Sequence, residues 1–261
     1  MRSDYEPILF DTPTDFDSVE ILFAHDIHYA NENYDMAKWE AFKKHVLELP
    51  NRYVIFCGDC FETAIVGSKS DIYTQTAPPQ TQKEWFTQQL LDLDGHVICI
   101  VPGNHEDRIT RTVGLYPLYD CAKDAGLEEY YRNNFAFVDI GVGIRRNKEK
   151  QIHYVGYIAH KLKDTKQYSG ADFVDGIDFC CYGHDHDAKD HARAKLVYDH
   201  NNKMVVHKNI EVLNSGAFLT YGGYAARGAY RPQTTKVYKL ILNGIDYHTA
   251  PKQMQTIGFY L

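Results

Sequence analysis

Apolar runs and amphipathic stretches alternate through the first hundred residues of the chain. The β-prone apolar runs are residues 19–24, 53–57 and 96–101. Between them, residues 35–49 and 79–93 place apolar side chains at three- and four-residue steps, which is typical of amphipathic helices. Asp35 can cap the first of these helices and Pro50 can close it. Strand, helix, strand, helix, strand predicts parallel β-α-β units.

After about residue 128 the pattern changes to apolar runs separated by short turns, so the second half is predicted to be mainly β. The predicted strands are residues 135–144, 151–158, 177–182, 192–198 and 204–209. Asn243 and Gly244 separate two further runs, 236–242 and 245–249, and this dipeptide favours a tight hairpin turn. We therefore expect an α/β fold in which a two-sheet β-sandwich is flanked by α-helices. No repeat or linker divides residues 1–261, which predicts a single domain.

Composition limits the cellular setting. The 261 residues are 44% hydrophobic, enough for one sizeable core, and no stretch approaches the roughly 20 apolar residues of a membrane span. The acidic opening lacks the layout of a signal peptide, and the six cysteines lie mostly in apolar runs, which favours reduced core thiols. These features predict a cytoplasmic protein without membrane contact. A net charge of −7 argues against broad adhesion to nucleic acid but does not exclude a nuclease.

Polar residues with metal-binding chemistry follow the predicted strands. They are Asp26 and His28, Asp59, Asn104 and His105, His160, and His184 and His186. Because ligands bind beyond the carboxyl ends of parallel strands, these side chains are expected to meet at one edge of the fold. Carboxylate and amide oxygens together with imidazoles are ligands of divalent cations, and one carboxylate can bridge two of them. Glu62 can steady such a site from behind the ligands.

The motifs resemble those of the calcineurin-like metallophosphoesterase superfamily over residues 19–187. The motifs are Asp26/His28, Gly58-Asp59-Cys60-Phe61-Glu62, Gly103-Asn104-His105-Glu106, His160 and Gly183-His184-Asp185-His186. The resemblance implies a helix-flanked two-sheet sandwich. It also implies two divalent cations, Mn²⁺ first and Fe or Zn²⁺ as alternatives. One would be held by Asp26, His28, Asp59 and His186, and the other by Asp59, Asn104, His160 and His184. His153 is the alternative to His160 as a metal ligand. We prefer His160, because it follows the predicted strand, whereas His153 would lie within that strand.

The resemblance implies phosphoester hydrolysis with Asp59 and His105 as catalytic residues. Two cations about 3.5 to 4 Å apart lower the pKa of a bridging water and supply hydroxide to attack phosphorus. His105 is placed to protonate the leaving oxygen or to stabilise the transition state. Asp59 would bridge the two cations.

The sequence indicates substrate-binding residues less specifically than metal ligands. Arg108 and Arg111 can clamp a phosphate, or they can belong to a solvated helix face. The tract 221–232 contains Tyr224, Arg227 and Arg231, which can stack on a base and bind phosphate, or can simply cover the sandwich. The polar segment 64–80 is predicted to be a long loop near the strand ends.

Three functional hypotheses follow. Hydrolysis of phosphodiesters in nucleotides or nucleic acids comes first, because the chain looks like small phosphodiesterases of phage and bacterial genomes. Phosphomonoester hydrolysis comes second. A non-catalytic scaffold that binds partner proteins is the third, and homo-oligomerisation stays open. The protein Ser/Thr phosphatases of the superfamily are disfavoured, because no Gly precedes Asp26 and no Asp-Arg-Gly follows Asp59.

Overall fold

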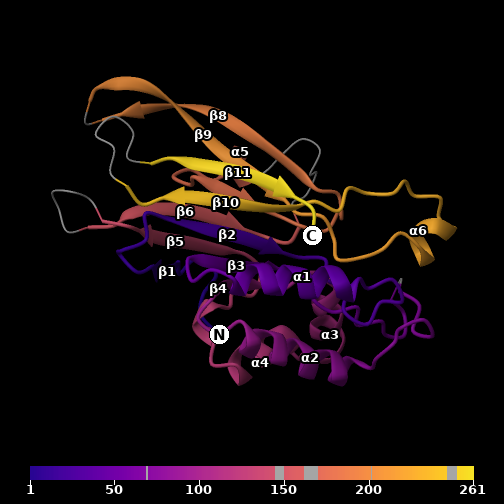
Figure 1. Cartoon of the computed structure of the whole chain (residues 1–261). Helices are drawn as coiled ribbons and strands as arrows, with labels where there is room; N and C mark the ends of the chain where they lie inside the picture. The colour runs from indigo at the N-terminus through magenta and orange to yellow at the C-terminus, as the bar shows by residue number, and fades with distance from the viewer. Residues whose placement is uncertain (69, 145–149, 162–169, 201, 246–251) are drawn as a thin grey trace.

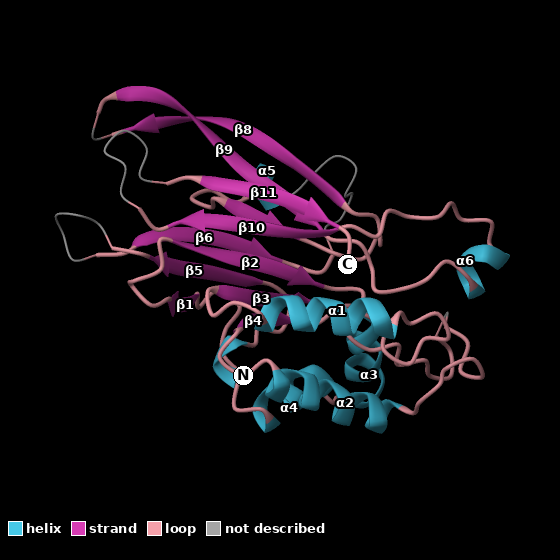
Figure 2. Ribbon diagram, in the orientation of Figure 1, coloured by secondary structure: helices cyan, strands magenta, loops and turns pink. Residues whose placement is uncertain are grey.

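The computed structural model describes residues 1–68, 70–144, 150–161, 170–200, 202–245 and 252–261. Two β-sheets pack face to face, and a layer of helices covers the outer face of one sheet (Figure 1). This arrangement confirms the predicted α/β fold, a two-sheet sandwich flanked by helices (Figure 2). Within the described residues, no helix has the length and apolar character needed to cross a membrane.

The five-stranded sheet has the order β11-β10-β2-β3-β4. Its strands are β11 (Met254–Phe259), β10 (Val237–Asn243), β2 (Ser18–Ala24), β3 (Arg52–Cys57) and β4 (Val97–Val101). The strands β2, β3 and β4 are parallel, as predicted, whereas β10 runs antiparallel to both β2 and β11.

The six-stranded sheet has the order β1-β5-β6-β7-β9-β8. Its strands are β1 (Ile8–Asp11), β5 (Ala136–Val142), β6 (Ile152–Ile158), β7 (Phe179–Cys181), β9 (Met204–Asn214) and β8 (Lys189–Asp199). The central strands β6, β7 and β9 are parallel, and β8 pairs with β9 in a long antiparallel ribbon.

The helices in chain order are α1 (Met36–Leu47), α2 (Pro79–Asp92), α3 (Asn104–Val113), α4 (Pro117–Asp124), the 3₁₀ turn η1 (Glu128–Tyr130), α5 (Gly170–Phe173) and α6 (Gly223–Arg227). Figure 2 shows α1 to α4 on the side of the five-stranded sheet that faces away from the sandwich, and α6 on an arm that projects from the body.

Alternate residues of the central strands enter two different apolar layers. Phe23 and Ile55 point into the core between the sheets, where they meet Val138 of the other sheet. Their neighbours Leu22 and Phe56 point to the helix layer. The two-residue period of a strand thus explains why β2 and β3 read as continuous apolar runs, since both faces are buried.

Helix α1 begins after Asp35, whose side chain accepts a hydrogen bond from the backbone N–H of Lys38 at 3.0 Å. Trp39, Phe42 and Val46 are buried, as the spacing predicts. The same spacing placed Met36 and Leu49 on the apolar face, and this was wrong, because both are exposed.

Lys38 takes an unexpected place in the helix layer. Its side chain is buried, and Nζ donates to the carbonyl oxygens of Ala217 and Thr235, each at 2.8 Å. Burial lowers the pKa of this ammonium group to about 8. Lys38 thereby ties α1 to the segment that follows β9.

The predicted tight turn at Asn243 and Gly244 is wrong. The partner of β10 is β11, and Leu242 pairs with Met254 rather than with a residue just beyond the dipeptide. Gly244 instead packs closely against Gly143, and Ile245 bridges Ile144 in the other sheet. The rest of the predicted second strand, 246–249, lies outside the described residues.

Candidate metal centre

The predicted ligands all lie at the carboxyl ends of strands. Asp26 and His28 follow β2, Asp59 follows β3, Asn104 and His105 follow β4, His160 follows β6, and His184 and His186 follow β7. The site therefore draws on both sheets at one end of the sandwich.

Five of these residues have left-handed backbones. The φ angles are 50° at Asp26, 49° at His28, 51° at Asp59, 77° at His184 and 60° at His186. For a residue other than glycine such a conformation costs of order 1–3 kcal/mol, and it persists only where the surroundings impose it. Strain of this kind gathers at functional sites, and all five residues lie shortly after strands β2, β3 and β7.

Two glycines allow the ligand segments to approach one another. A Cβ at Gly58 would lie 2.6 Å from the backbone nitrogen of Gly103 and 2.7 Å from Cγ of His160. A Cβ at Gly103 would lie 2.1 Å from Oδ1 of Asp59. The loops after β3 and β4 can therefore meet only because neither position carries a side chain.

Gly58→Ala is expected to weaken metal binding at least tenfold, because its new methyl group would displace Gly103 and His160. Gly95→Ala is the matched control. The φ angles of Gly58 and Gly95 are 81° and 77°, so each substitution costs about 1–2 kcal/mol of backbone strain. A Cβ at Gly95 meets nothing within 4 Å. Titration calorimetry with Mn²⁺ compares the two variants, and equal affinities would show that the close approach does not shape the site.

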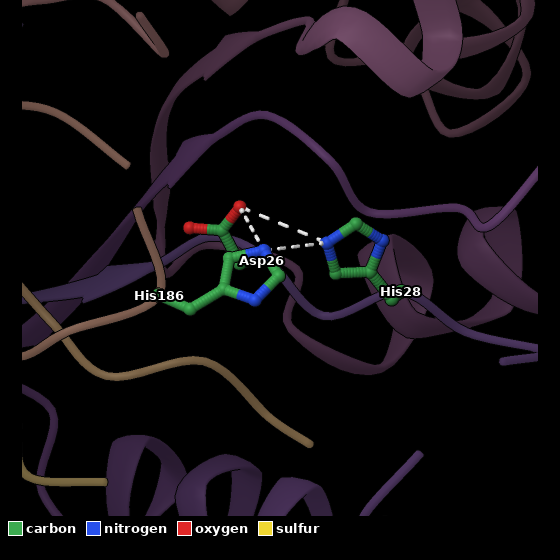
Figure 3. Close-up of side chains that lie close together, drawn as sticks. All are labelled: Asp26, His28 and His186. Carbon is green, nitrogen blue, oxygen red and sulfur yellow. Dashed lines mark hydrogen bonds and ion pairs between the residues drawn. The ribbon is translucent and has the colours of Figure 1, made fainter. Parts of the chain in front are cut away.

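The first ligand cluster consists of Asp26, His28 and His186 (Figure 3). Nε2 of His28 lies 3.1 Å from Nε2 of His186, which lies 3.4 Å from Oδ1 of Asp26. Nε2 of His28 is 3.8 Å from the same carboxylate oxygen. Two imidazole nitrogens and one carboxylate oxygen thus converge on a small volume, as ligands of a single cation do.

The second ligand cluster consists of Asp59, His160 and His184. Nδ1 of His160 donates to the carbonyl oxygen of Cys57 at 2.7 Å, while Nε2 lies 3.2 Å from Oδ2 of Asp59. A nitrogen lone pair that faces a carboxylate oxygen favours a cation or a proton between them. Oδ2 of Asp59 is also 3.8 Å from Nε2 of His28, so this carboxylate borders both clusters.

Three buried atoms test whether the site suits metal ions. Oδ1 of Asp26, Oδ1 of Asn104 and Nε2 of His160 have no hydrogen-bond partner among the described residues. Buried polar atoms are rarely left without a partner, and coordination of a cation would satisfy all three. A mixed set of carboxylate, amide and imidazole donors suits Mn²⁺, Fe and Zn²⁺. The residues present therefore fit the two divalent cations that the motifs imply.

The charges of the site favour cations. Burial alone would raise the pKa of Asp59, but the neighbouring His160 and His105 lower it far below its usual value. Burial alone would lower the pKa of His28, but the carboxylates of Glu62, Asp59 and Asp26 raise it to about 9. Both shifts show that the carboxylates of the site stabilise a nearby positive charge.

Glu62 supports the first cluster, as the sequence predicted. Its Oε2 lies 3.3 Å from Nδ1 of His28 and accepts a hydrogen bond from Nδ2 of Asn31 at 2.9 Å. The contacts of His28 with Asp26 and His186 run through its other nitrogen, Nε2. A carboxylate behind a histidine orients the ring and raises its basicity as a ligand.

Glu106 and His25 have structural roles that the sequence did not indicate. The Glu106 carboxylate accepts hydrogen bonds from the backbone N–H groups of Asp59, Phe61 and Gly103, at 2.7 to 3.0 Å. Glu106 lies three residues after Gly103 and caps the backbone at the start of α3, although Gly103 has no side chain to complete a capping box. Nδ1 of His25 lies 2.6 Å from Oδ2 of Asp26, a contact for which the sequence offered no signal.

His105 lies beside the carboxylates of Asp59 and Glu62, at the edge of the clusters. Its backbone N–H donates to Oδ1 of Asp59 at 2.8 Å, and its Nε2 lies 3.9 Å from Oδ2 of Asp59. Nδ1 donates to the carbonyl oxygen of Glu62 at 2.7 Å. Nη2 of Arg108 lies 2.8 Å from Nε2, so the arginine reaches the site.

Arg111 does not join this group. Its side chain is 80% exposed and pairs with Asp107 on the same helix, with 3.0 Å between Nη2 and Oδ2. From the sequence, Arg108 and Arg111 had the same two alternatives, a phosphate clamp or a solvated helix face. In the structure Arg108 contacts His105, whereas Arg111 lies on the solvated helix face.

The arm that carries α6 is anchored beside the first cluster. Nη2 of Arg231 lies 3.2 Å from Oδ2 of Asp187, the residue after His186. Arg227 is exposed, with its Nη2 3.8 Å from Oε1 of Glu32. Tyr224 is a residue of α6, and the structure describes its backbone but not its side chain.

His153, the alternative to His160, lies elsewhere. It is on β6, 49% of its side chain is exposed, and Nδ1 pairs with Asp139 at 2.8 Å. His160 is the histidine of this pair that the structure brings to Asp59.

Comparisons with known proteins place the chain in a family. Solved structures with similar folds include Vps29 from Entamoeba histolytica complexed with Zn²⁺, at 10% identity, TM-score 0.42 and coverage of 92% of this chain and 99% of that one. They also include a metallophosphoesterase from Sphaerobacter thermophilus, at 11% identity, TM-score 0.42 and coverage of 93% and 89%. No curated protein matches the sequence. The sequence profile of the calcineurin-like phosphoesterases matches residues 20–223, and the chain therefore belongs to this family.

Proposed function

We propose that the protein is a two-metal phosphodiesterase that hydrolyses phosphodiester bonds in nucleotides or nucleic acids. The family acts on phosphoester substrates and binds divalent metals. The observation that carries the proposal is the pair of clusters, Asp26 with His28 and His186 and Asp59 with His160 and His184, whose ligand atoms converge within each cluster. Oδ1 of Asp26, Oδ1 of Asn104 and Nε2 of His160 are buried there without a hydrogen-bond partner among the described residues. Coordination of divalent cations would satisfy these atoms.

The ligand sets follow the two clusters. Asp26, His28, Asp59 and His186 would hold one cation, and Asp59, Asn104, His160 and His184 would hold the other. When bound, the cations supply Lewis acidity and a water of lowered pKa, and Mn²⁺ is the first choice.

The protein's own groups position these ligands and the substrate. The backbone N–H of His105 fixes the Asp59 carboxylate, and Glu62 fixes the ring of His28. Nε2 of His105 lies 3.9 Å from Oδ2 of Asp59 at the border of the clusters, so the ring would adjoin the place of the reacting phosphate.

The projecting arm supports a nucleotide or nucleic-acid substrate. Tyr221 and Tyr230 are exposed on it, and the hydroxyl of Tyr221 donates to the carbonyl oxygen of Tyr230 at 2.7 Å. Aromatic rings beside arginines such as Arg227 can stack on bases and attract the phosphate backbone. Because Asp187 and Arg231 tie the arm to the loop of His186, a bound base would lie near the reacting phosphate.

Metal-stripped protein is expected to gain both stability and activity when Mn²⁺ is added. At 100 times the dissociation constant, a single bound ion stabilises the fold by about 2.7 kcal/mol, which raises the melting temperature. Hydrolysis of bis-p-nitrophenyl phosphate should appear with Mn²⁺ and exceed that of p-nitrophenyl phosphate. Differential scanning fluorimetry and the absorbance of released p-nitrophenolate measure the two effects on the same samples.

The other outcomes separate the alternatives. Faster hydrolysis of the monoester would identify a phosphomonoesterase. A rise in melting temperature without turnover, with any of Mn²⁺, Fe²⁺ or Zn²⁺, would identify a metal-binding scaffold. Active protein should next be tested on single-stranded oligonucleotides and on cyclic nucleotides, which distinguish a nuclease from a nucleotide phosphodiesterase.

A further inference from the structure

Arg108 is held in a fixed orientation at the border of the metal centre. Nη1 donates to the carbonyl oxygen of Glu62 at 3.2 Å and to Oγ of Ser70 at 2.8 Å. Nη2 lies 2.8 Å from Nε2 of His105. The side chain is partly buried, and its contacts with Glu62, Ser70 and His105 restrict the guanidinium group.

The contacts of His105 define the direction of the bond with Arg108. A carbonyl oxygen only accepts, so Nδ1 of His105 donates to Glu62 and carries the proton of the neutral ring. Nε2 is then the acceptor for the guanidinium. The arginine and the histidine therefore form one hydrogen-bonded unit, in which the positive charge belongs to Arg108.

The guanidinium keeps donors for a further ligand. Arginine has five N–H groups, and the contacts with Glu62, Ser70 and His105 use one each. Within the described ranges, no acceptor contacts Nε or the second hydrogen of Nη2. This charged donor lies close to the Asp59 carboxylate, because Nε2 of His105, which Nη2 contacts, is 3.9 Å from Oδ2 of Asp59.

We propose that Arg108 is the anion anchor of the site, and that it binds a non-bridging oxygen of the substrate phosphoryl group while His105 and Ser70 hold it in place. The inference rests on the proposed function and adds a residue that the metal motifs do not contain. Ser70 belongs to the irregular segment before α2, so this segment helps to set the position of the anchor.

The experiment compares Arg108→Met with Arg111→Met in Mn²⁺-loaded protein. Both variants remove a guanidinium from α3, but only Arg108 contacts His105. Inorganic phosphate is the probe. The dissociation constant of phosphate, measured by calorimetry, should rise about tenfold or more in Arg108→Met, because a hydrogen bond to a charged group contributes about 1.5–3 kcal/mol. Arg111→Met should match the wild type.

Kinetics and spectroscopy exclude a merely structural effect. KM for bis-p-nitrophenyl phosphate should rise in Arg108→Met more than kcat falls, and Arg108→Lys should recover part of the loss by restoring the charge. In ¹⁵N-histidine spectra, the Nδ1–H form of His105 should persist in the variant while the Nε2 resonance moves. A melting temperature equal to that of Arg111→Met would show that the fold is intact.

Each result decides between two distinct claims. Wild-type turnover with an unchanged phosphate affinity in Arg108→Met would overturn the anchor and leave the phosphodiesterase standing. An inactive wild type would overturn the proposed function, and the calorimetric comparison would still judge Arg108, because phosphate binding does not depend on turnover. If Arg108→Met and Arg111→Met weaken phosphate binding equally, the loss reflects the lower positive charge of the surface in general. The role of Arg108 as the anion anchor would then be wrong.

Discussion

Asp59→Asn is expected to release metal from both positions and to lower kcat/KM about a thousandfold or more. Metal-ion catalysis contributes several kcal/mol to a reaction of this type, and each 1.36 kcal/mol is about tenfold in rate. Oδ2 of Asp59 lies 3.2 Å from Nε2 of His160 and 3.8 Å from Nε2 of His28, so one substitution affects both clusters. The amide is nearly isosteric but lacks the charge that two cations require.

Metal content and turnover should be measured on the same preparations, by mass spectrometry and by diester hydrolysis. Asp107→Asn is the matched control, because it makes the same substitution in α3. The Asp107 carboxylate pairs with Arg111 at the surface and belongs to neither cluster. If Asp59→Asn retained two equivalents of metal, the bridging role assigned to Asp59 would be wrong.

His105→Gln is expected to lower kcat about 10² to 10⁴-fold with both metals retained. The backbone N–H of residue 105 still fixes the Asp59 carboxylate in this variant, so the ligands keep their geometry. Only the imidazole is lost, whose Nε2 lies 3.9 Å from Oδ2 of Asp59 and 2.8 Å from Nη2 of Arg108. The effect should therefore appear in turnover and not in metal affinity.

His153→Gln provides the control for the loss of an imidazole, because His153 is on the exposed face of β6 and pairs with Asp139. It should keep full metal content and full activity. Loss of metal from His105→Gln would place His105 among the ligands, and unchanged kcat would remove it from the reaction altogether.

Periodicity predicted the central elements because their burial is regular. Strands β2, β3 and β4 are buried on both faces, and α1 buries Trp39 and Phe42 at helical spacing, so each gives a strong local pattern. The strands β1 and β11 were not predicted, because these two segments bury few side chains and show only weak alternation.

Asn243 and Gly244 show where local turn chemistry fails. The dipeptide is favoured in tight hairpins, but here a tertiary contact decides the conformation. A Cβ at Gly143 would lie 2.0 Å from the carbonyl oxygen of Gly244, so the two glycines allow the sheets to approach closely. Such a pairing between distant segments leaves no signal in either one alone.

The sequence identified the candidate ligand residues as a set, but it did not identify their surroundings. Asp26, Asp59 and His160 stand in motifs at strand ends, which sequence alone can locate. The bond from Arg108 to His105 depends on the helix that begins at Asn104, and it distinguishes Arg108 from Arg111 in a way that their sequence context does not show. Side-chain partners follow from three-dimensional packing.

The place of β10 beside β2 has a consequence for biosynthesis. Glu20 on β2 and Lys239 on β10 are hydrogen-bonded although 219 positions separate them, and 158 positions separate His28 from His186. A ribosome makes the chain from the N-terminus, so β2 emerges long before the strand that covers its edge. The nascent chain thus exposes an apolar strand edge to chaperones and other nascent chains. Metal can be acquired only after His186 has emerged, which makes cofactor loading a late step of maturation.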